Sequence, residues 1–552
     1  MADGRIRGLD FGTSTSLVSE STALAPQVVP IGRTQRWIPT VVAKDGVKWF
    51  VGDEASALPE SQVIRSIKRV ITREQLHVIM TTDSGDVVVD ADEAIVEVLR
   101  HIGSAAESNM AGLTDHGSVR LGCPAMWTGP QRERLVRLAT RAGIAVGDAT
   151  LIDEPIAAGI AWVNHRLRRG SDVSGNVLVF DMGGGTLDVA VLEVNARQGM
   201  TPAISVQAAV GVDEAGDALD ELIAAELERK LSETGLDIDS HANASELRAW
   251  ILADARAAKL ELSDLRDVPV VFSYPHASLP NQRYSREELE SAFLPQLTRA
   301  LRTVEWALRA ALMVQFVGGH ERKTLSPRQA RQLSMKELAK GIDHVLVMGG
   351  MARVPAVVES LGTVFSPEQI YVGIDDDPAS AIVLGLAEQA SYERLNLHRP
   401  GFDFVLEWFD DGSEVPKSCI VYRAYSPLYT PESAINTDST KFRWDSSGID
   451  LPRKGTAILK VRSIGGTTIA FRFDGREAEG HAFTFGSRPA FVSLEPNGRV
   501  FIRDGAGRES SMRIAQWPVI RGVRHEAVVV VKDHTDKRAK DPSLVWHQMP
   551  YD

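Results

Sequence analysis

Residues 177–194 read VLVFDMGGGTLDVAVLEV, and this stretch decides the fold class. An apolar run leads to Asp181, a turn of three glycines follows, and a second apolar run begins soon after it. Apolar runs of this length, bounded by glycine, are typical of buried strands. The stretch therefore predicts two buried strands joined by a tight turn that exposes several backbone amides.

A second stretch near the start of the chain has the same pattern, because LDFGTST at 9–15 aligns with FDMGGGT at 180–186. The similarity indicates an internal duplication. Backbone amides in such turns approach phosphate oxygens closely, and Asp10 and Asp181 are placed to hold Mg²⁺ largely through its water ligands. Either turn alone is compatible with an ordinary tight turn, but two facing turns predict a clamp for a polyphosphate.

The pattern of predicted secondary structure changes towards the C-terminal end of the chain. Over residues 1–392, strand patterns alternate with helical patterns, which predicts an α/β domain. We expect one lobe at about 1–173 and 366–392 and a second lobe at about 174–365. Over residues 400–552, short strand patterns separated by turn residues predict a separate all-β domain, a sandwich or a barrel.

Long helices are predicted where apolar residues recur with helical spacing. The five stretches with this spacing are 91–106, 130–143, 217–231, 245–262 and 285–312.

The composition of the 552-residue chain is that of an ordinary globular protein, with 44% hydrophobic and 24% charged residues. Cys123 and Cys419 lie far apart without metal-ligand spacing, which argues against a disulfide framework or a zinc site and favours a reducing cytoplasm. A net charge of −12 disfavours nucleic acid as the main partner. No stretch approaches the roughly 18–20 apolar residues that cross a bilayer, so we expect no membrane insertion.

Six ordered segments carry a specific resemblance. They are RGLDFGTSTSLV (7–18), SIKRVI (66–71), GCPAMWTGPQR (122–132), LIDEPIAAGIAW (151–162), LVFDMGGGTLDVAVL (178–192) and HVLVMGGMARVP (344–355). Over roughly residues 5–390 the chain resembles the ATPase domain of the seventy-kilodalton heat-shock proteins, the Hsp70 or DnaK-like family of the actin-like ATPase superfamily. The resemblance implies a two-lobed fold of duplicated ribonuclease-H-like domains, followed here by a non-standard C-terminal β domain.

The resemblance also implies a hydrolytic site for ATP and ADP with Mg²⁺, and it leaves K⁺ open as a further cofactor. Asp10 and Asp181 would hold the magnesium, mainly through water. Lys68 would reach the γ-phosphate, and Glu154 would orient or deprotonate the attacking water. The implied catalytic residues are Lys68, Glu154, Asp181, Thr186 and Asp188. For Lys68 the alternative is a solvated lysine on a helix, and for Glu154 it is a charge that stabilises a helix N-terminus.

The resemblance further implies two groups of residues around this centre. The cofactor-binding residues would be Asp10, Gly12, Thr13, Ser14, Gly183, Gly184, Gly185, Gly216, Lys259, Ser263, Gly349, Gly350, Arg353 and Asp377. Pro124 and Arg132 match the family pair that relays the nucleotide state from Glu154 and Lys68 towards the domain surface.

Several positions depart from the family pattern. Arg256 replaces an acidic adenosine contact, Leu260 replaces an arginine that stacks on adenine, and Met351 replaces a serine. Losing a stacked arginine costs about 1–2 kcal/mol, so we expect a weaker nucleotide site with less base selectivity. Thr150 replaces the arginine implicated in contact with J-domain cochaperones, which leaves that partnership open.

The C-terminal region lacks the family's leucine linker and helical lid. We expect it to bind a protein client or partner through residues 400–552. The preferred hypothesis is a slow, magnesium-dependent ATP hydrolase of chaperone type, located in the cytoplasm. The alternatives are a nucleotide-sensing scaffold without turnover, an actin-like filament-forming ATPase and, least favoured, a sugar kinase.

Overall fold

The structure is a computed structural model of the 552-residue chain, and it describes the residues in the following ranges. The described residues are 5–82, 85–114, 119–147, 150–200, 202–241, 243–313, 316–317, 320–321, 325, 327–375, 377–388, 393–396, 399–410, 412–429, 444–446, 451–495, 498–516, 520–521, 524–525 and 527–532.

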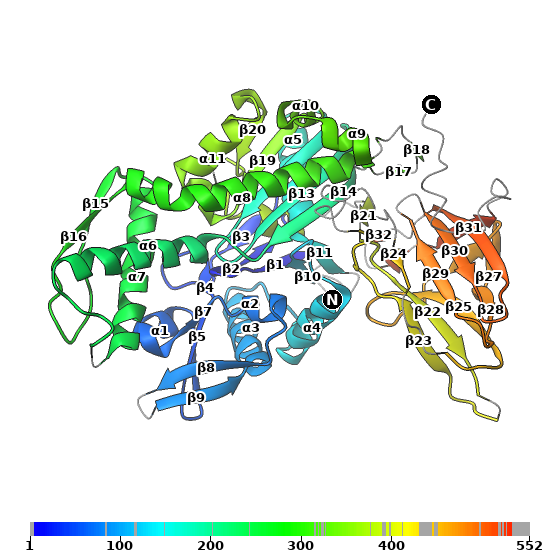
Figure 1. Cartoon of the computed structure of the whole chain (residues 1–552), viewed down its shortest axis with the longest axis horizontal. Helices are drawn as coiled ribbons and strands as arrows, with labels where there is room; N and C mark the ends of the chain where they lie inside the picture. Colours follow the sequence, from blue (N-terminus) through cyan, green and yellow to red (C-terminus); the bar gives the residue numbers. More distant parts are fainter. Residues whose placement is uncertain are drawn as a thin grey trace.

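Two six-stranded sheets form the centre of the N-terminal region (Figure 1). The first has the order β11 (Leu151–Asp153), β10 (Val119–Cys123), β1 (Arg7–Phe11), β2 (Thr15–Glu20) and β3 (Gln27–Val29), with β4 (Ile38–Pro39) paired to β2. The second has the order β20 (Ile370–Val372), β19 (His344–Met348), β12 (Val173–Met182), β13 (Leu187–Ala196), β14 (Ala203–Val212) and β21 (Glu393–Asn396). Each sheet mixes parallel and antiparallel pairs.

The predicted strands at 177–194 are confirmed as the antiparallel pair β12 and β13. In this pair Asp181 lies directly opposite Asp188. Alternate side chains of β12 enter two different cores, because successive residues of a strand point to opposite faces. Phe180 packs in the core that includes α6–α8, whereas Val179 packs in the core that includes α5 and α12. Both faces of the sheet are therefore buried, as the continuous apolar runs predict.

Helices cover these sheets, and the five predicted long helices are all present. The main helices are α3 (Ala91–Ser108), α4 (Gly129–Arg141), α5 (Glu154–Arg168), α6 (Gly216–Glu233), α7 (Ala244–Leu262), α8 (Arg286–Met313) and α12 (Ala381–Leu386). Local signals set their starts: the Asp90 side chain accepts from two backbone amides of α3, and a capping box of Thr128 and Gln131 opens α4. The predicted two-lobed α/β class is confirmed.

A smaller subdomain is inserted between β4 and β10. It comprises β5 (Val41–Asp45), β6 (Lys48–Val51), α1 (Asp53–Ser56), η1 (Glu60–Gln62), β7 (Ile64–Arg65), α2 (Arg69–Thr72), β8 (His77–Thr82), β9 (Gly85–Asp90) and α3. The short helix α2 follows Lys68 directly, so this insertion brings the predicted catalytic lysine to the cleft.

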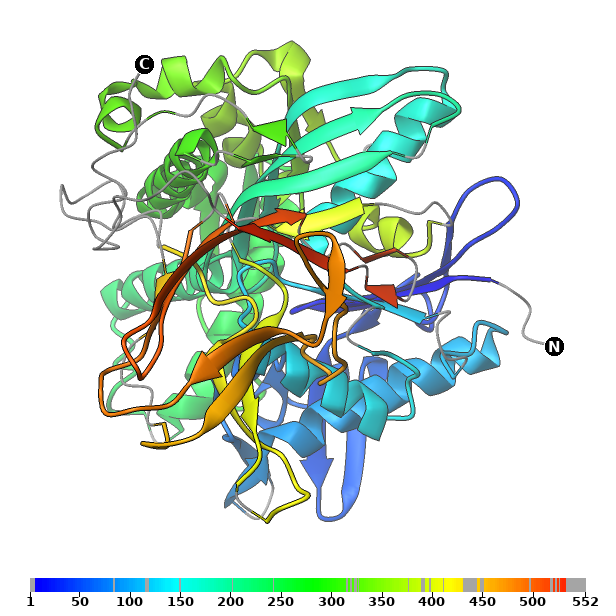
Figure 2. The same cartoon turned by 90° about the vertical axis from the view of Figure 1, so that its right-hand side faces the viewer.

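The C-terminal region is β-rich, as predicted, and its two principal sheets share one core. One has the order β23 (Lys417–Tyr422), β22 (Asp403–Trp408), β25 (Thr456–Arg462) and β28 (His481–Thr484). The other has the order β24 (Trp444–Asp445), β29 (Phe491–Leu494), β30 (Arg499–Arg503), β31 (Glu509–Gln516), β34 (Val528–Lys532), β26 (Phe471–Phe473) and β27 (Arg476–Ala478). Leu406 and Leu459 of the first sheet belong to the same buried core as Ile502 and Ile514 of the second. The two sheets therefore form a sandwich, and the course of their strands can be followed in Figure 2.

The predicted domain boundaries stay predictions. Strand β20 belongs to the second sheet, whereas α12 packs against strands of the first sheet. Residues 533–552 of the predicted β domain lie outside the described residues. Within the described ranges, no helix is both long and apolar enough to cross a membrane.

Candidate active site

The two predicted phosphate turns lie directly against each other, one from each of the two six-stranded sheets. A Cβ added at Gly184 would lie 1.9 Å from Ser14 Oγ, and one added at Gly185 would lie 2.7 Å from Thr13 Cγ2. A Cβ at Gly12 would lie 2.2 Å from the Thr15 carbonyl oxygen. No residue larger than glycine fits these positions without a shift, so the structure brings together the two turns that the sequence singles out.

Lys68 and Glu154 form a buried ion pair. The Lys68 Nζ donates to Glu154 Oε1 at 2.7 Å, and both side chains are almost inaccessible to water. Glu154 opens α5 directly after strand β11, whereas Lys68 comes from the inserted subdomain. The Lys68 side chain also lies over the Trp127 ring, at 5.6 Å from its centroid. Lys68 is therefore not the solvated surface lysine that was the alternative.

Three further carboxylates surround this pair. Asp10 is the second-last residue of β1, Asp181 is the second-last residue of β12, and Asp188 lies opposite Asp181 on β13. All three are buried. Burial and the nearby charge of Glu154 raise the pKa of Asp10 to about 7. The same two causes raise the pKa of Asp188 to about 7. Burial, Glu154 and Asp188 together raise the pKa of Asp181 well above its usual value.

For the ammonium of Lys68, burial acts on the pKa in the opposite direction. Burial alone would lower its pKa, but the carboxylates of Glu154 and Asp10 outweigh that effect and raise the pKa of Lys68 above its usual value. Lys68 therefore stays charged at neutral pH and remains a donor for an anionic ligand.

The residues at this centre fit a divalent cation. Four carboxylates face a single ammonium, and Oδ1 of Asp188 is buried with no hydrogen-bond partner in the described structure. Buried anions of this kind are costly unless a cation or hydrogen bonds compensate them. Across the described ranges, no group of three or more histidine, cysteine, aspartate or glutamate side chains is arranged to hold a metal ion directly. That Asp10 and Asp181 hold Mg²⁺ mainly through its waters stays a prediction.

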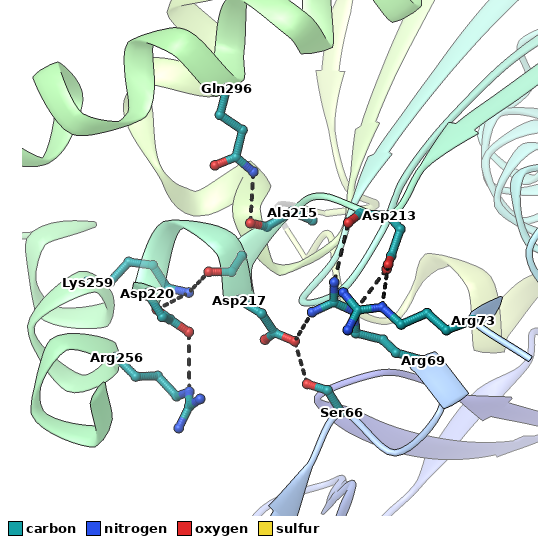
Figure 3. A network of polar contacts seen from close by, with 11 residues as sticks. Ser66, Arg69, Arg73, Asp213, Ala215, Asp217, Asp220, Arg256, Lys259 and Gln296 are labelled. Atoms are coloured by element: carbon teal, nitrogen blue, oxygen red, sulfur yellow. Dashed lines mark hydrogen bonds and ion pairs between the residues drawn. The ribbon is translucent and has the colours of Figure 1, made fainter. Parts of the chain in front are cut away.

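The predicted cofactor-binding residues Gly216 and Lys259 lie together, but Lys259 is already paired inside the protein. Its Nζ is 2.6 Å from Asp220 Oδ1 and donates to the Gly216 carbonyl oxygen at 3.0 Å (Figure 3). The Arg256 Nε lies 3.3 Å from Asp220 Oδ2, so one buried carboxylate serves both cations. Met351 is buried against Gly216, where a Cβ would lie 3.2 Å from its sulfur. Leu260 is 64% exposed, so it packs little against the protein.

The remaining predicted cofactor-binding residues lie in different surroundings. Gly349 lies against the end of β12, because a Cβ there would be 2.6 Å from Asp181 Oδ1. Arg353, by contrast, is exposed. The carboxylate of Asp377 accepts from Ser380 Oγ at 2.5 Å and from Arg36 Nη2 at 2.9 Å. Ser263 Oγ donates to the Lys259 carbonyl oxygen at 3.3 Å.

Other predicted residues occupy the turns themselves. The backbone N–H of Gly183 donates to the Thr186 carbonyl oxygen at 3.1 Å, which closes the glycine turn. A Cβ added at Gly350 would meet no atom of the described residues within 4 Å.

Arg132 is fully buried and connects the site to the C-terminal sandwich. It donates to Asp153 Oδ1 at 2.5 Å and to the Pro124 carbonyl oxygen at 3.2 Å. Its guanidinium lies 3.7 Å from the centroid of the Tyr425 ring, in the loop after β23. Since Asp153 directly precedes Glu154, a short path leads from Glu154 through Asp153 and Arg132 to the C-terminal sandwich.

Further contacts hold the β module against this end of the N-terminal region. The backbone N–H of Gly129 donates to the Ala424 carbonyl oxygen at 2.9 Å. The Arg399 Nη1 donates to the Met126 carbonyl oxygen at 2.8 Å. The Tyr429 hydroxyl donates to the Ala310 carbonyl oxygen at 3.4 Å.

Sequence reasoning misses four residues that this geometry brings to the site. Asp153 adjoins Glu154 and could have been noticed as the partner of a buried arginine. Arg69 follows Lys68 and lies against Gly185, where a Cβ would be 2.9 Å from Arg69 Cδ. Tyr425 and Asp217 carry no signal in the sequence, because their partners are distant along the chain.

One protein-family model matches this chain. The family model described as Hsp70 protein matches residues 6–322, which is more than half of the 552 residues. The chain belongs to the Hsp70 family. This confirms the resemblance that the six ordered segments predict.

Three curated relatives of this chain are named as chaperones or heat shock-related proteins. A chaperone protein DnaK of Ureaplasma parvum is 27% identical over 361 residues, covering 65% of this chain and 53% of the relative. A DnaK of Thermus thermophilus is 28% identical over 410 residues, covering 69% and 60%. A stromal 70 kDa heat shock-related protein of Pisum sativum chloroplasts is 26% identical over 416 residues, covering 70% and 53%. The chain thus spans somewhat over half the length of these curated relatives.

Proposed function

We propose that this chain hydrolyses ATP slowly with Mg²⁺ and uses its nucleotide state to control the C-terminal sandwich. The observation that supports this most is the buried Lys68–Glu154 pair, 2.7 Å apart, beneath two facing turns. The arrangement offers backbone amides for phosphate oxygens, a fixed ammonium for the terminal phosphate and a carboxylate for water.

In this proposal each residue at the centre has a distinct task. Mg²⁺ would be held through Asp10 and Asp181 and would neutralise phosphate charge. Among the described hydrogen bonds Lys68 donates only to Glu154, so two of its three N–H groups would remain for the terminal phosphate. Glu154 accepts a proton from the attacking water, while Thr186 and Asp188 orient that water.

Control of the β module would pass through Arg132. A change at Glu154 moves Asp153, which holds the Arg132 guanidinium that stacks on Tyr425. Such a stacked arginine, removed from water, contributes about 2 kcal/mol. A protein client is proposed as the partner of residues 400–552, by analogy with the family's chaperones. Contact with J-domain cochaperones stays open, and a cytoplasmic location stays a prediction.

A nucleotide-sensing scaffold is the second candidate. Lys259 and Arg256 are both engaged by Asp220, and Met351 packs where the family has a serine. A site with these departures could hold a nucleotide without useful turnover. Tight binding of Mg-ATP together with negligible phosphate release would favour this candidate.

Phosphate release from Mg-ATP by the full chain tests the proposal. We expect Lys68→Ala to lower kcat about 100-fold or more, because it removes a preorganised donor to the terminal phosphate. Lys48→Ala is the matched control, since Lys48 is an exposed lysine of the same subdomain, and its rate should stay near the parent's. If Lys68→Ala turned over ATP within a factor of two of the parent, the site assignment would be wrong.

A further inference from the structure

The segment that presents Lys68 begins with an unusual backbone conformation at Ser66. Its φ is 57°, in the left-handed region that residues other than glycine rarely adopt. The Ser66 carbonyl oxygen accepts from the Arg69 N–H at 2.9 Å, and the Lys68 carbonyl oxygen accepts from the Ile71 N–H at 3.1 Å. These bonds start α2, so the direction of Lys68 depends on the conformation of Ser66.

A side chain from the other side of the cleft holds Ser66. The Ser66 Oγ donates to Asp217 Oδ2 at 2.5 Å, and the Arg69 Nη1 donates to the same oxygen at 3.5 Å (Figure 3). Asp217 lies in the first turn of α6, whereas Ser66 and Arg69 belong to the inserted subdomain. The contact therefore exists only while the two sides of the cleft are together.

The backbone of Asp217 is in turn bonded to the glycine turn. Its N–H donates to the Gly184 carbonyl oxygen at 2.6 Å, and the preceding Gly216 N–H donates to the Gly183 carbonyl oxygen at 3.1 Å. Asp217 thus joins the predicted phosphate turn, through its backbone, to the Lys68 segment, through its carboxylate.

A second carboxylate reinforces the closure without touching Ser66. The Arg69 Nε donates to Asp213 Oδ1 at 2.9 Å, and the Arg73 Nε donates to Asp213 Oδ2 at 2.6 Å. Closure is therefore held at several points, but among the described contacts only the Asp217 carboxylate reaches the strained residue.

We infer that Asp217 is a positioning residue for Lys68: by holding Ser66 left-handed, it brings the lysine into place only when the cleft is closed around the glycine turn. The inference rests on the proposed function, because it concerns the same hydrolytic site. It predicts that lobe closure and assembly of the catalytic lysine are one event.

The test is a double-mutant cycle on the full chain, with kcat and KM measured for Mg-ATP. Asp217→Ala should lower kcat about tenfold, because a displacement of about 1 Å is enough for such a loss, and should change KM less than threefold. Glycine adopts the left-handed conformation at little cost, so Asp217→Ala should cost less than threefold when introduced into Ser66→Gly. Glu214→Ala is the matched control, because Glu214 pairs with Arg299 at 2.9 Å on the neighbouring helix α8 and should leave kcat near the parent value.

Hydrogen exchange provides a readout that does not need turnover. In the nucleotide-free chain, Asp217→Ala should speed exchange of the amides of residues 69–72 about tenfold, and the double variant should show a smaller increase over Ser66→Gly. Equal losses of kcat in both backgrounds, a change in KM alone, or unchanged exchange at 69–72 would each overturn the inference. A parent without ATPase activity would refute the proposed function, and exchange at 69–72 would still decide the role of Asp217.

Discussion

At the scale of single residues, burial controls the protonation of the carboxylates in the cleft. Asp10 and Asp188 have their pKa raised to about 7 by burial and by the charge of Glu154. In an unfolded chain an aspartate has a pKa of about 3.9. Between these values the folded protein binds more protons than the unfolded chain, so raising the pH favours unfolding.

The metal-free protein should therefore lose stability as the pH rises from about 4 to about 7. The expected loss is on the order of 3 kcal/mol for each of the two carboxyls. Urea denaturation in a chelator at several pH values measures it, and Asp188→Asn should flatten the slope because it removes one of the titrating groups. A stability that rises with pH over this window in the parent, or a slope that Asp188→Asn leaves unchanged, would contradict the environment described for these aspartates.

At the scale of elements, two short turns determine whether a polyphosphate can be enclosed. The turn after β1 and the turn after β12 touch through Ser14 and Gly184. Their strands are buried on both faces, so each turn is held firmly on the core of its own sheet.

Gly184→Ala should weaken binding of Mg-ATP about tenfold, because the added Cβ would lie 1.9 Å from Ser14 Oγ. Isothermal calorimetry measures the affinity, and the nucleotide-free denaturation midpoint shows whether the variant is folded. Gly103→Ala is the control, since a Cβ at this α3 position meets only Ile144 Cγ1, at 4.0 Å. Equal affinity of Gly184→Ala and the parent would argue against the facing turns as the phosphate site.

Most of these elements could be predicted from the sequence, because their signals are local. The strands that end at Asp10 and Asp181, and the glycine turns after them, follow from apolar runs and turn residues. The contact of Ser66 with Asp217 could not be predicted, because the two residues are 151 positions apart and meet only through lobe closure. The pairing of Lys259 with Asp220 could not be predicted either. Both residues lie on predicted helices, and no sequence pattern specifies how two helices are rotated relative to each other.

At the scale of the whole molecule, the candidate active site and the β sandwich are joined at Arg132. The sequence does not predict Tyr425 as the partner of Arg132. An aromatic residue in a loop is usually interpreted as part of the hydrophobic core. Under the proposed function, a nucleotide-dependent change at Glu154 would reach the sandwich over three residues, namely Asp153, Arg132 and Tyr425.

Tyr425→Ala should uncouple the two parts. Loss of the stacked cation, worth about 2 kcal/mol, would shift their docking equilibrium roughly 30-fold. Hydrogen exchange of residues 417–429 should differ between Mg-ATP and Mg-ADP in the parent, and this difference should at least halve in Tyr425→Ala. Phe409→Ala, at a residue that is 61% exposed, should keep the difference. An undiminished difference in Tyr425→Ala would exclude this route.

The same hydrogen-exchange measurement, applied to the two turns, tests the central claim most directly. With saturating Mg-ATP, amides of residues 12–16 and 183–187 should be protected at least about tenfold relative to the nucleotide-free chain, and omission of Mg²⁺ should remove most of that protection. Exchange at both turns that is identical with and without Mg-ATP would contradict the account.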